Sequence, residues 1–370
     1  DRPPEQAFIN PDNLEILLNH VKCAAFELPV RDGERYGTGH TGNDIGEMCQ
    51  FLADLKLLHH SGGAWHWTSD SYPADAVSLR SISSDNFVVV DITGDHQVIA
   101  EVAYTAALTT LHEKAIYLHD ARQYQVERFD FTGRKAYVRR VDSDYYTDAI
   151  TYNRVTIIDT FSEPAVASNG EVHVVSRVVG FKKIKFYTNE NVGSGELDLP
   201  EQQMHTTAYW LTVPAALMRA LPYAPDDRRD GIVGLAFAMR QVAQLLLMCD
   251  RQDIGISIGN ADGQEDVAPN RAGYPESVGD EPRIFVYDNY PGGIGFSEPL
   301  FRMHEDLVGR TRTLIAGCEC QHGCPTCVGP IGNTGPLAKT VALRILELLV
   351  SPATHAPASV PAQTGDEVPF

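Results

Sequence analysis

Four cysteines stand within ten residues of one another near the end of this 370-residue chain. They form the run Cys318-Glu-Cys320-Gln-His-Gly-Cys324-Pro-Thr-Cys327. Four thiolates this close together can complete a tetrahedral shell around one zinc ion. Glycines at 317, 323 and 329 permit the unusual backbone angles of tight metal-binding turns. Since all four ligands come from the protein, no position is left open, and the run predicts a structural Zn²⁺ site rather than a catalytic one.

Two other chemistries fit the same four residues. Iron–sulfur clusters are also held by cysteine thiolates, and close thiols also form redox-active pairs or local disulfides. His322 lies between the cysteine pairs, and we expect it to be a bystander because four sulfurs are nearer. The other three cysteines lie in apolar helical patterns typical of small buried side chains: Cys23, Cys49 and Cys249. This usage indicates a cytoplasmic protein rather than a secreted disulfide framework.

The formal net charge of −19 excludes a uniformly basic nucleic-acid binder and electrostatic adhesion to an anionic membrane. We expect no membrane-spanning segment, because the most apolar run, residues 231–249, is interrupted by Arg240, Gln241 and Gln244. The chain begins at Asp1, without an initiator Met and without a signal peptide. We therefore expect it to be a fragment or a processed product of a longer protein, with catalytic parts encoded upstream.

The first 82 residues predict a winged-helix-like domain. Helical spacing of apolar residues follows a start signal at Asn10-Pro-Asp-Asn13, and a second helix starts at Asn43-Asp44. A Gly62-Gly63 turn then precedes an alternation of Trp65 and Trp67 that is typical of a strand. Two helices followed by a glycine-initiated ribbon is the element order of a winged helix.

Residues 83–200 predict a central antiparallel β-barrel-like region, because short strand patterns alternate there with Gly, Asp and Asn turns. The segment 111–190 carries 12 Lys and Arg against 11 Asp and Glu, while the rest of the chain carries 18 against 38. Cations interleaved with aromatic side chains are what a surface for single-stranded DNA needs, since bases stack and phosphates pair. An ordinary amphipathic sheet with a charged outer face explains the same composition equally well.

Strand alternation predicts that Arg128 and Tyr124 share one face, and that Lys135, Tyr137 and Arg139 share one face. The candidate DNA contacts are the cations Arg128, Arg134, Lys135, Arg139, Arg140, Lys182, Lys183 and Lys185 and the stacking partners Tyr117, Tyr124 and Tyr145.

Residues 201–350 predict an α/β domain that holds the four cysteines, and the Pro- and Ala-rich segment 351–370 predicts a disordered tail. Two glycine-rich segments in this domain resemble phosphate-binding loops. Pro291-Gly-Gly-Ile-Gly295 lacks the full dinucleotide fingerprint, and a close-packing turn explains it at least as well. The segment 332–340 has Ala338 where a P-loop needs glycine before Lys339, so we reject it as a nucleotide site. The sequence shows no catalytic residues, and we expect the chain by itself not to be an enzyme.

Six stretches together carry a family resemblance: residues 8–13, residues 18–29, Ala115-Ile-Tyr-Leu-His119 with Tyr124, Asp144-Tyr-Tyr-Thr147, Tyr287-Asp-Asn-Tyr-Pro-Gly-Gly-Ile-Gly-Phe296 and the cysteine run. In this order they resemble the C-terminal region of MrfA-type, SftH-like bacterial superfamily II DNA helicases. The resemblance implies an α+β multidomain chain, with a winged helix and a four-cysteine zinc domain that follow two RecA-like ATPase domains in the parent protein.

The resemblance implies the non-catalytic, DNA-engaging region of an ATP-dependent 3′–5′ helicase or translocase in DNA repair. Its partners would be single-stranded DNA, bound weakly and locally, and the ATPase domains of the same protein. Two alternatives stay open: a zinc-stabilised protein-interaction scaffold without motor activity, as in a phage-defence complex, and a thiol redox sensor that rests on the cysteines alone.

Overall fold

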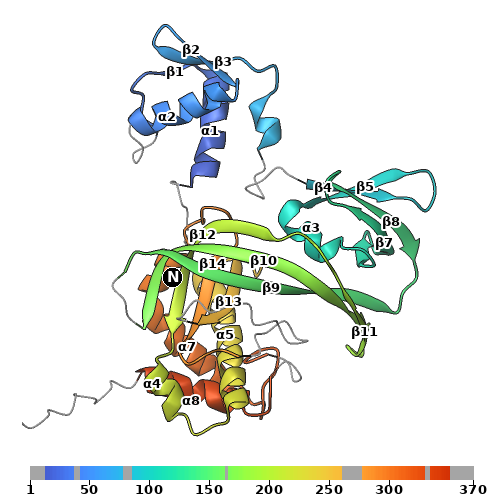
Figure 1. The fold of residues 1–370 in the computed structure, drawn as a ribbon, viewed down its shortest axis with the longest axis vertical. Helices are drawn as coiled ribbons and strands as arrows, with labels where there is room; N and C mark the ends of the chain where they lie inside the picture. Colours follow the sequence, from blue (N-terminus) through green and yellow to red (C-terminus); the bar gives the residue numbers. More distant parts are fainter. Residues whose placement is uncertain are drawn as a thin grey trace, which may run out of the picture.

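The computed structural model describes residues 13–36, 42–77, 86–162, 166–260, 277–329 and 334–350. Figure 1 shows a small helical module with a three-stranded sheet, a five-stranded sheet beside it, and a long curled sheet backed by helices. The predicted fold class, an α+β chain with a winged helix, a barrel-like sheet and a C-terminal cysteine cluster, is confirmed. The tail 351–370 lies outside the described residues.

The winged helix has the element order that the sequence predicts. It consists of α1 (Leu14–Glu27), β1 (Val30–Arg31), α2 (Gly42–Asp54), β2 (Leu58–Ser61) and β3 (Ala64–Trp67), and η1 (Pro73–Ala76) follows it. The strands pair in the order β1-β3-β2, and the β2–β3 turn places both Gly62 and Gly63 at positive φ. Leu17, Leu52 and Trp65 meet in its core, because the apolar residues of both helices recur at helical spacing.

The five-stranded sheet has the order β5-β4-β8-β7-β6. Its elements are β4 (Asn86–Asp91), β5 (Gln97–Ala103), α3 (Tyr104–Thr110), β6 (Ile116–His119), β7 (Arg122–Asp130) and β8 (Lys135–Val141). One face packs beneath α3 through Phe87, Val89 and Val138, and the other faces outward. We expected a wholly antiparallel sheet, but the β4–β8 pair is parallel. The chain passes through β5, α3, β6 and β7 between these two strands, and this crossover lets β8 run in the same direction as β4.

The curled sheet is built around one long strand. Its strands are β9 (Tyr145–Thr160), β10 (Ala167–Lys185), β11 (Asn191–Glu196), β12 (Gln202–Thr212), β13 (Ile254–Asn260) and β14 (Pro282–Asp288). β10 pairs with β9 along its length, with β12 over its first half and with β11 over its second. The edges β9 and β13 approach each other, and the Ser257 hydroxyl donates to the Asn153 carbonyl at 3.1 Å. The concave side is filled by Val172, Trp210, Phe285 and other apolar side chains.

The β-rich region expected over residues 83–200 is therefore divided between two sheets. Strands β4 to β8 form one sheet, while β9, β10 and β11 join β12, β13 and β14 in the other. The boundary expected at residue 200 falls inside the curled sheet, since β10 and β12 on either side of it are hydrogen-bonded neighbours.

Two helices pack directly on the convex side of the curled sheet, α5 (Pro225–Leu247) and α6 (Ser297–Arg302). Three more form an outer layer: α7 (His304–Gly317) and α8 (Ala338–Val350) pack on α5, and α4 (Ala215–Ala220) packs on α8. Between α6 and α7 the helix is interrupted at Met303, which is the C-cap of α6 and the N-cap of α7. By length and composition α5 would suffice to cross a membrane, but 67% of its most apolar window is buried inside the fold. It packs as the core helix of this unit.

The interior of the curled sheet leaves no room for an extra methyl group at Gly255. A Cβ added there would lie 2.1 Å from Cζ of Tyr287, so we expect Gly255→Ala to lower the free energy of unfolding by about 1–3 kcal/mol. Gly309→Ala is the control, since nothing lies within 4 Å of its Cβ position on α7. It should be neutral or stabilise by up to about 1 kcal/mol in the same urea titration. Equal stability of the two variants would contradict this packing.

Candidate zinc centre and nucleic-acid interface

The four cysteines lie on the loop that follows α7. Cys318 caps the end of α7, and the loop then turns back at Cys324, whose carbonyl accepts hydrogen bonds from the N–H groups of Cys327 and Gly329. The loop packs on α5, where Gly234 leaves room for Val328. Gly323 has φ +140°, and a Cβ there would lie 2.7 Å from a methyl group of Val328. Close approach of Val328 to α5 explains Gly234, and the tight turn of the loop on itself, at positive φ, explains Gly323.

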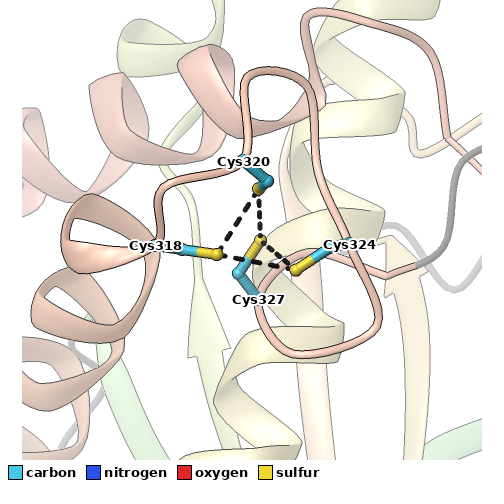
Figure 2. Close-up of side chains that lie close together, drawn as sticks. All are labelled: Cys318, Cys320, Cys324 and Cys327. Atoms are coloured by element: carbon cyan, nitrogen blue, oxygen red, sulfur yellow. Dashed lines mark hydrogen bonds between the residues drawn. The ribbon is translucent and has the colours of Figure 1, made fainter.

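Figure 2 shows the four side chains converging on one point. The Sγ–Sγ distances are 3.5 Å for Cys318–Cys320, 3.5 Å for Cys318–Cys324, 3.4 Å for Cys320–Cys327 and 3.7 Å for Cys324–Cys327. A zinc ion with Zn–S bonds of about 2.3 Å places its sulfurs about 3.8 Å apart. A disulfide needs about 2.05 Å, far below these values. The predicted ligand set is thus brought together as one tetrahedral site, and His322 instead contacts the Pro336 carbonyl.

The four thiols do not ionise equally. Burial opposes ionisation of Cys324, but hydrogen bonds from the Thr326 and Cys327 backbone hold the pKa of its thiol below the usual range. Burial raises the pKa of Cys327, which is the fully buried member of the set. A bound divalent cation removes such a proton outright, so the donors suit a metal that prefers thiolates.

Lys339 clamps this loop from α8. Its Nζ donates to the carbonyls of Cys318 and Cys320 at 2.5 and 2.6 Å and lies 3.8 Å from Sγ of Cys320. Four thiolates outweigh the charge of one Zn²⁺, and a half-buried ammonium group offsets that excess. The lysine of the P-loop-like segment therefore serves the cysteine loop, which agrees with the rejection of a nucleotide site there.

The second glycine-rich segment is a packing turn. Oδ2 of Asp288 accepts hydrogen bonds from the N–H groups of Ile294, Gly295 and Phe296 at 2.7, 2.9 and 3.2 Å. Burial raises the pKa of Asp288 to about 6, and these N–H donors act in the opposite direction. Because the donors that a phosphate would need already hold a carboxylate, this turn is not an anion site.

The candidate DNA contacts fall into separate groups. Arg128, Lys135 and Arg139 lie on the outward face of the five-stranded sheet together with Tyr137. The guanidinium of Arg128 lies 4.0 Å from the centroid of the Tyr137 ring, and Arg139 pairs with Glu127 at 2.5 Å. Arg140 points to the opposite face at the exposed end of β8.

Tyr124 is wrong as a stacking partner because its side chain is buried, and a β-bulge turns Arg128 away from it. The register shifts between Val126 and Arg128, which turns Arg128 outward while Tyr124 stays inside at 3% exposure. Tyr117 pairs across from Tyr124 and packs on the same core. The stacking role of the half-buried Tyr117 stays a prediction. The predicted shared face of Arg128 and Tyr124 is therefore wrong, whereas that of Lys135, Tyr137 and Arg139 is confirmed.

Arg134 is also directed inward. Its guanidinium lies 4.6–5.1 Å from the ring centroids of Phe87, Tyr104 and Phe131, and it donates to the Phe131 carbonyl. This arginine holds the sheet core together, so we remove it from the interface.

The remaining candidates lie on the far half of the β9–β10 ribbon. Lys183 lies 5.0 Å from the centroid of the Tyr145 ring, and Lys185 lies 3.9 Å from Asp144. Lys182 pairs across from Asp148 on the other face. Lys183 and Lys185 share one face with Asp144, and Lys182 shares the other with Asp148, so each face carries little net charge. The DNA role of this group stays a prediction.

Comparison with known proteins gives the context of these sites. Residues 235–328 match the MrfA Zn-binding domain model, and residues 9–82 match the winged helix domain model of the ATP-dependent helicase HRQ1. The two matches fall on the cysteine-containing unit and on the N-terminal module of the chain. The predicted resemblance to the C-terminal region of MrfA-type helicases is confirmed.

Two individual proteins that the chain resembles are helicases. The chain is 38% identical to the uncharacterised ATP-dependent helicase YprA of Bacillus subtilis, over 89% of this chain and 42% of the relative. It is 25% identical to the ATP-dependent helicase HRQ1 of Saccharomyces cerevisiae, over 86% of this chain and 29% of the relative. It therefore spans less than half the length of these relatives.

Two solved structures are similar in fold. The crystal structure of the DUF1998 helicase MrfA bound to DNA is 36% identical and covers 94% of this chain and 44% of its own, with a TM-score of 0.51. A second crystal structure of the DUF1998 helicase MrfA is 32% identical over 92% of this chain and 45% of its own, with a TM-score of 0.57.

We expect the purified chain to contain one zinc ion. Cys324→Ser removes one ligand and should lower both zinc content and solubility, because binding free energy at such sites is partly folding free energy. Cys249→Ser is the control, since Cys249 lies outside the cluster. Elemental analysis that finds iron with sulfide, or full zinc in Cys324→Ser, would contradict the assignment.

Lys339→Met should weaken zinc binding by about tenfold or more, as removal of groups that orient metal ligands commonly does. Zinc release to a chromogenic chelator measures the effect. Lys339→Arg keeps the charge and should recover part of the loss. Lys22→Met removes a lysine on α1, far from the loop in sequence, and should release zinc at the wild-type rate. Equal release from Lys339→Met and wild type would show that the clamp does not support the ion.

Proposed function

We propose that this chain is the non-catalytic, DNA-engaging region of an ATP-dependent 3′–5′ DNA helicase or translocase of the cytoplasm that acts in DNA repair. RecA-like ATPase domains elsewhere in the same protein would hydrolyse ATP, and this chain would hydrolyse none. The similarity to a helicase whose structure is bound to DNA supports this assignment. The cysteine site would hold Zn²⁺ and would stabilise the unit without taking part in chemistry.

The observation that carries the DNA role is the outward face of the five-stranded sheet. We call the set Arg128, Lys135, Tyr137 and Arg139 the sheet-face cluster. It combines three cations with an aromatic ring already approached by a guanidinium, the combination on which bases stack and phosphates pair. Glu127 neutralises part of this charge, so binding would be weak and strongly dependent on salt.

Fluorescence anisotropy with a short single-stranded oligonucleotide tests the cluster. Each neutralised phosphate contributes a slope of about −0.7 in log K against log salt, so three cations give a slope of roughly −2. The triple variant R128A/K135A/R139A should lose affinity and most of that slope. Arg344→Ala is a matched control, because it removes an exposed arginine of α8 that pairs with Glu347.

A second triple variant, K182A/K183A/K185A, examines the β9–β10 ribbon. An unchanged slope supports the sheet-face cluster. If this variant loses the slope and R128A/K135A/R139A keeps it, the ribbon is the DNA surface and our choice of face is wrong.

One observation favours the scaffold alternative for the winged helix alone. Its α2 carries Asp44, Glu47 and Asp54 and no Lys or Arg, which disfavours insertion into a DNA groove. Phe26 and Tyr72 are exposed nearby, with ring centroids 5.2 Å apart. A winged helix of this composition fits a protein partner better than duplex DNA. Partner capture that Phe26→Ser abolishes, with DNA binding unchanged, would support this division of labour.

A further inference from the structure

One buried side-chain amide forms hydrogen bonds with two distant parts of the chain. Asn13 is 2% exposed and stands immediately before α1. Its Oδ1 accepts hydrogen bonds from the N–H groups of Glu15 and Ile16, both at 3.1 Å. These two bonds satisfy backbone donors that a helix start otherwise leaves without a partner, so Asn13 is the N-cap of α1.

The other end of the same side chain reaches the turn after β14. Nδ2 of Asn13 donates to the carbonyl of Pro291 at 2.9 Å and to that of Gly293 at 2.7 Å. The N-terminal end of α1 lies beside the ends of β12 and β14 (Figure 1). All the ordinary bonding capacity of one amide, two donors and two acceptor lone pairs, is therefore used across a sequence separation of about 280 residues.

The turn that receives Asn13 is held rigidly from its own side. Besides the three N–H groups that bind Asp288, the Gly292 N–H donates to the His205 carbonyl at 2.8 Å. The Thr206 hydroxyl lies within hydrogen-bond distance of the carbonyls of Asp288 and Tyr290. The acceptors for Asn13 are therefore preset, and little further ordering is needed when the amide binds.

The turn also has space only for glycine at the contact. Gly292 has φ +74°, and a Cβ there would lie 2.9 Å from Nδ2 of Asn13. The segments around Asn13 and Gly292 were two of the most distinctive in the sequence, and the structure joins them directly.

We propose that Asn13 is a latch between domains, by which we mean that its amide both caps α1 and bonds to the turn at Pro291–Gly293. It thereby fixes the winged helix to the zinc-binding unit, the curled sheet with its helices and cysteine loop, so that the two move as one body. This role is independent of the proposed DNA function. Aspartate can cap α1 but cannot donate to two carbonyls, and serine can cap it but is too short to bridge.

Asn13→Ser and Asn13→Asp separate the two halves of the latch, because both keep a side-chain oxygen for the cap. We expect ¹⁵N relaxation of the zinc-loaded protein to show winged-helix amides tumbling with the rest of the chain in wild type and faster in both variants. Amide exchange at Glu15 and Ile16 should stay as slow as in wild type, which shows that α1 is still capped.

Asn19→Ser makes the same change on the same helix, where Asn19 bonds only to Lys22 among the described contacts. This control should tumble like wild type. The proposal is overturned if Asn13→Ser and Asn13→Asp tumble like Asn19→Ser. It is also overturned if faster tumbling appears only with faster exchange at Glu15 and Ile16, since loss of the cap would then explain the whole effect.

Discussion

Four sulfur atoms lie within 4.8 Å of one another on a loop that has no strand or helix of its own. Such a loop cannot hold thiolates together without a counter-charge, since like charges at this distance repel. Three helices hold the loop in place. Cys318 follows directly on α7, Gly234 of α5 leaves space for Val328, and Lys339 of α8 supplies the positive charge and donates to the loop carbonyls. The three helices are packed together by their own apolar core, and each also contributes one contact to the cysteine loop.

Metal ligands, helix starts and tight turns could be predicted from the sequence, because residues close together along the chain determine them. The cysteine spacing predicted the ligand set, Asn13 predicted the start of α1, and Gly62-Gly63 predicted the turn between β2 and β3. For the turn at Pro291–Gly295 the sequence left a phosphate site and a packing turn open, and the structure favours the packing turn, because Asp288 occupies its N–H groups. The segment 332–340 was rejected on its missing glycine, and the structure adds that its Lys339 contacts the cysteine loop. Nothing in the spacing showed that Lys339 would reach the cysteines.

Long-range pairing could not be predicted in the same way. A strand pattern does not reveal its partner, so the β-rich region read as one unit although β9 to β11 pair with the C-terminal strands. A single extra residue at the β7 bulge reversed the facing of Arg128 relative to Tyr124, because side chains alternate with a period of two. Arg134 looked like a free cation for a related reason: its aromatic partners lie on three different segments of the chain.

The β9–β10 ribbon carries a further consequence. The half of the ribbon that contains the start of β10 pairs with β12 in the curled sheet. The other half contacts the five-stranded sheet, where the Thr147 hydroxyl accepts a hydrogen bond from the Ile116 N–H and Phe181 stacks on His112. The distance between the two sheets therefore depends on the number of residues in the ribbon, since each strand residue adds about 3.3 Å. An insertion of one residue in each strand would turn Thr147 and Phe181 away from their partners, whereas two would keep their facing. Two added residues in each strand would also lengthen the ribbon by about 7 Å, and with it the separation of the two sheets.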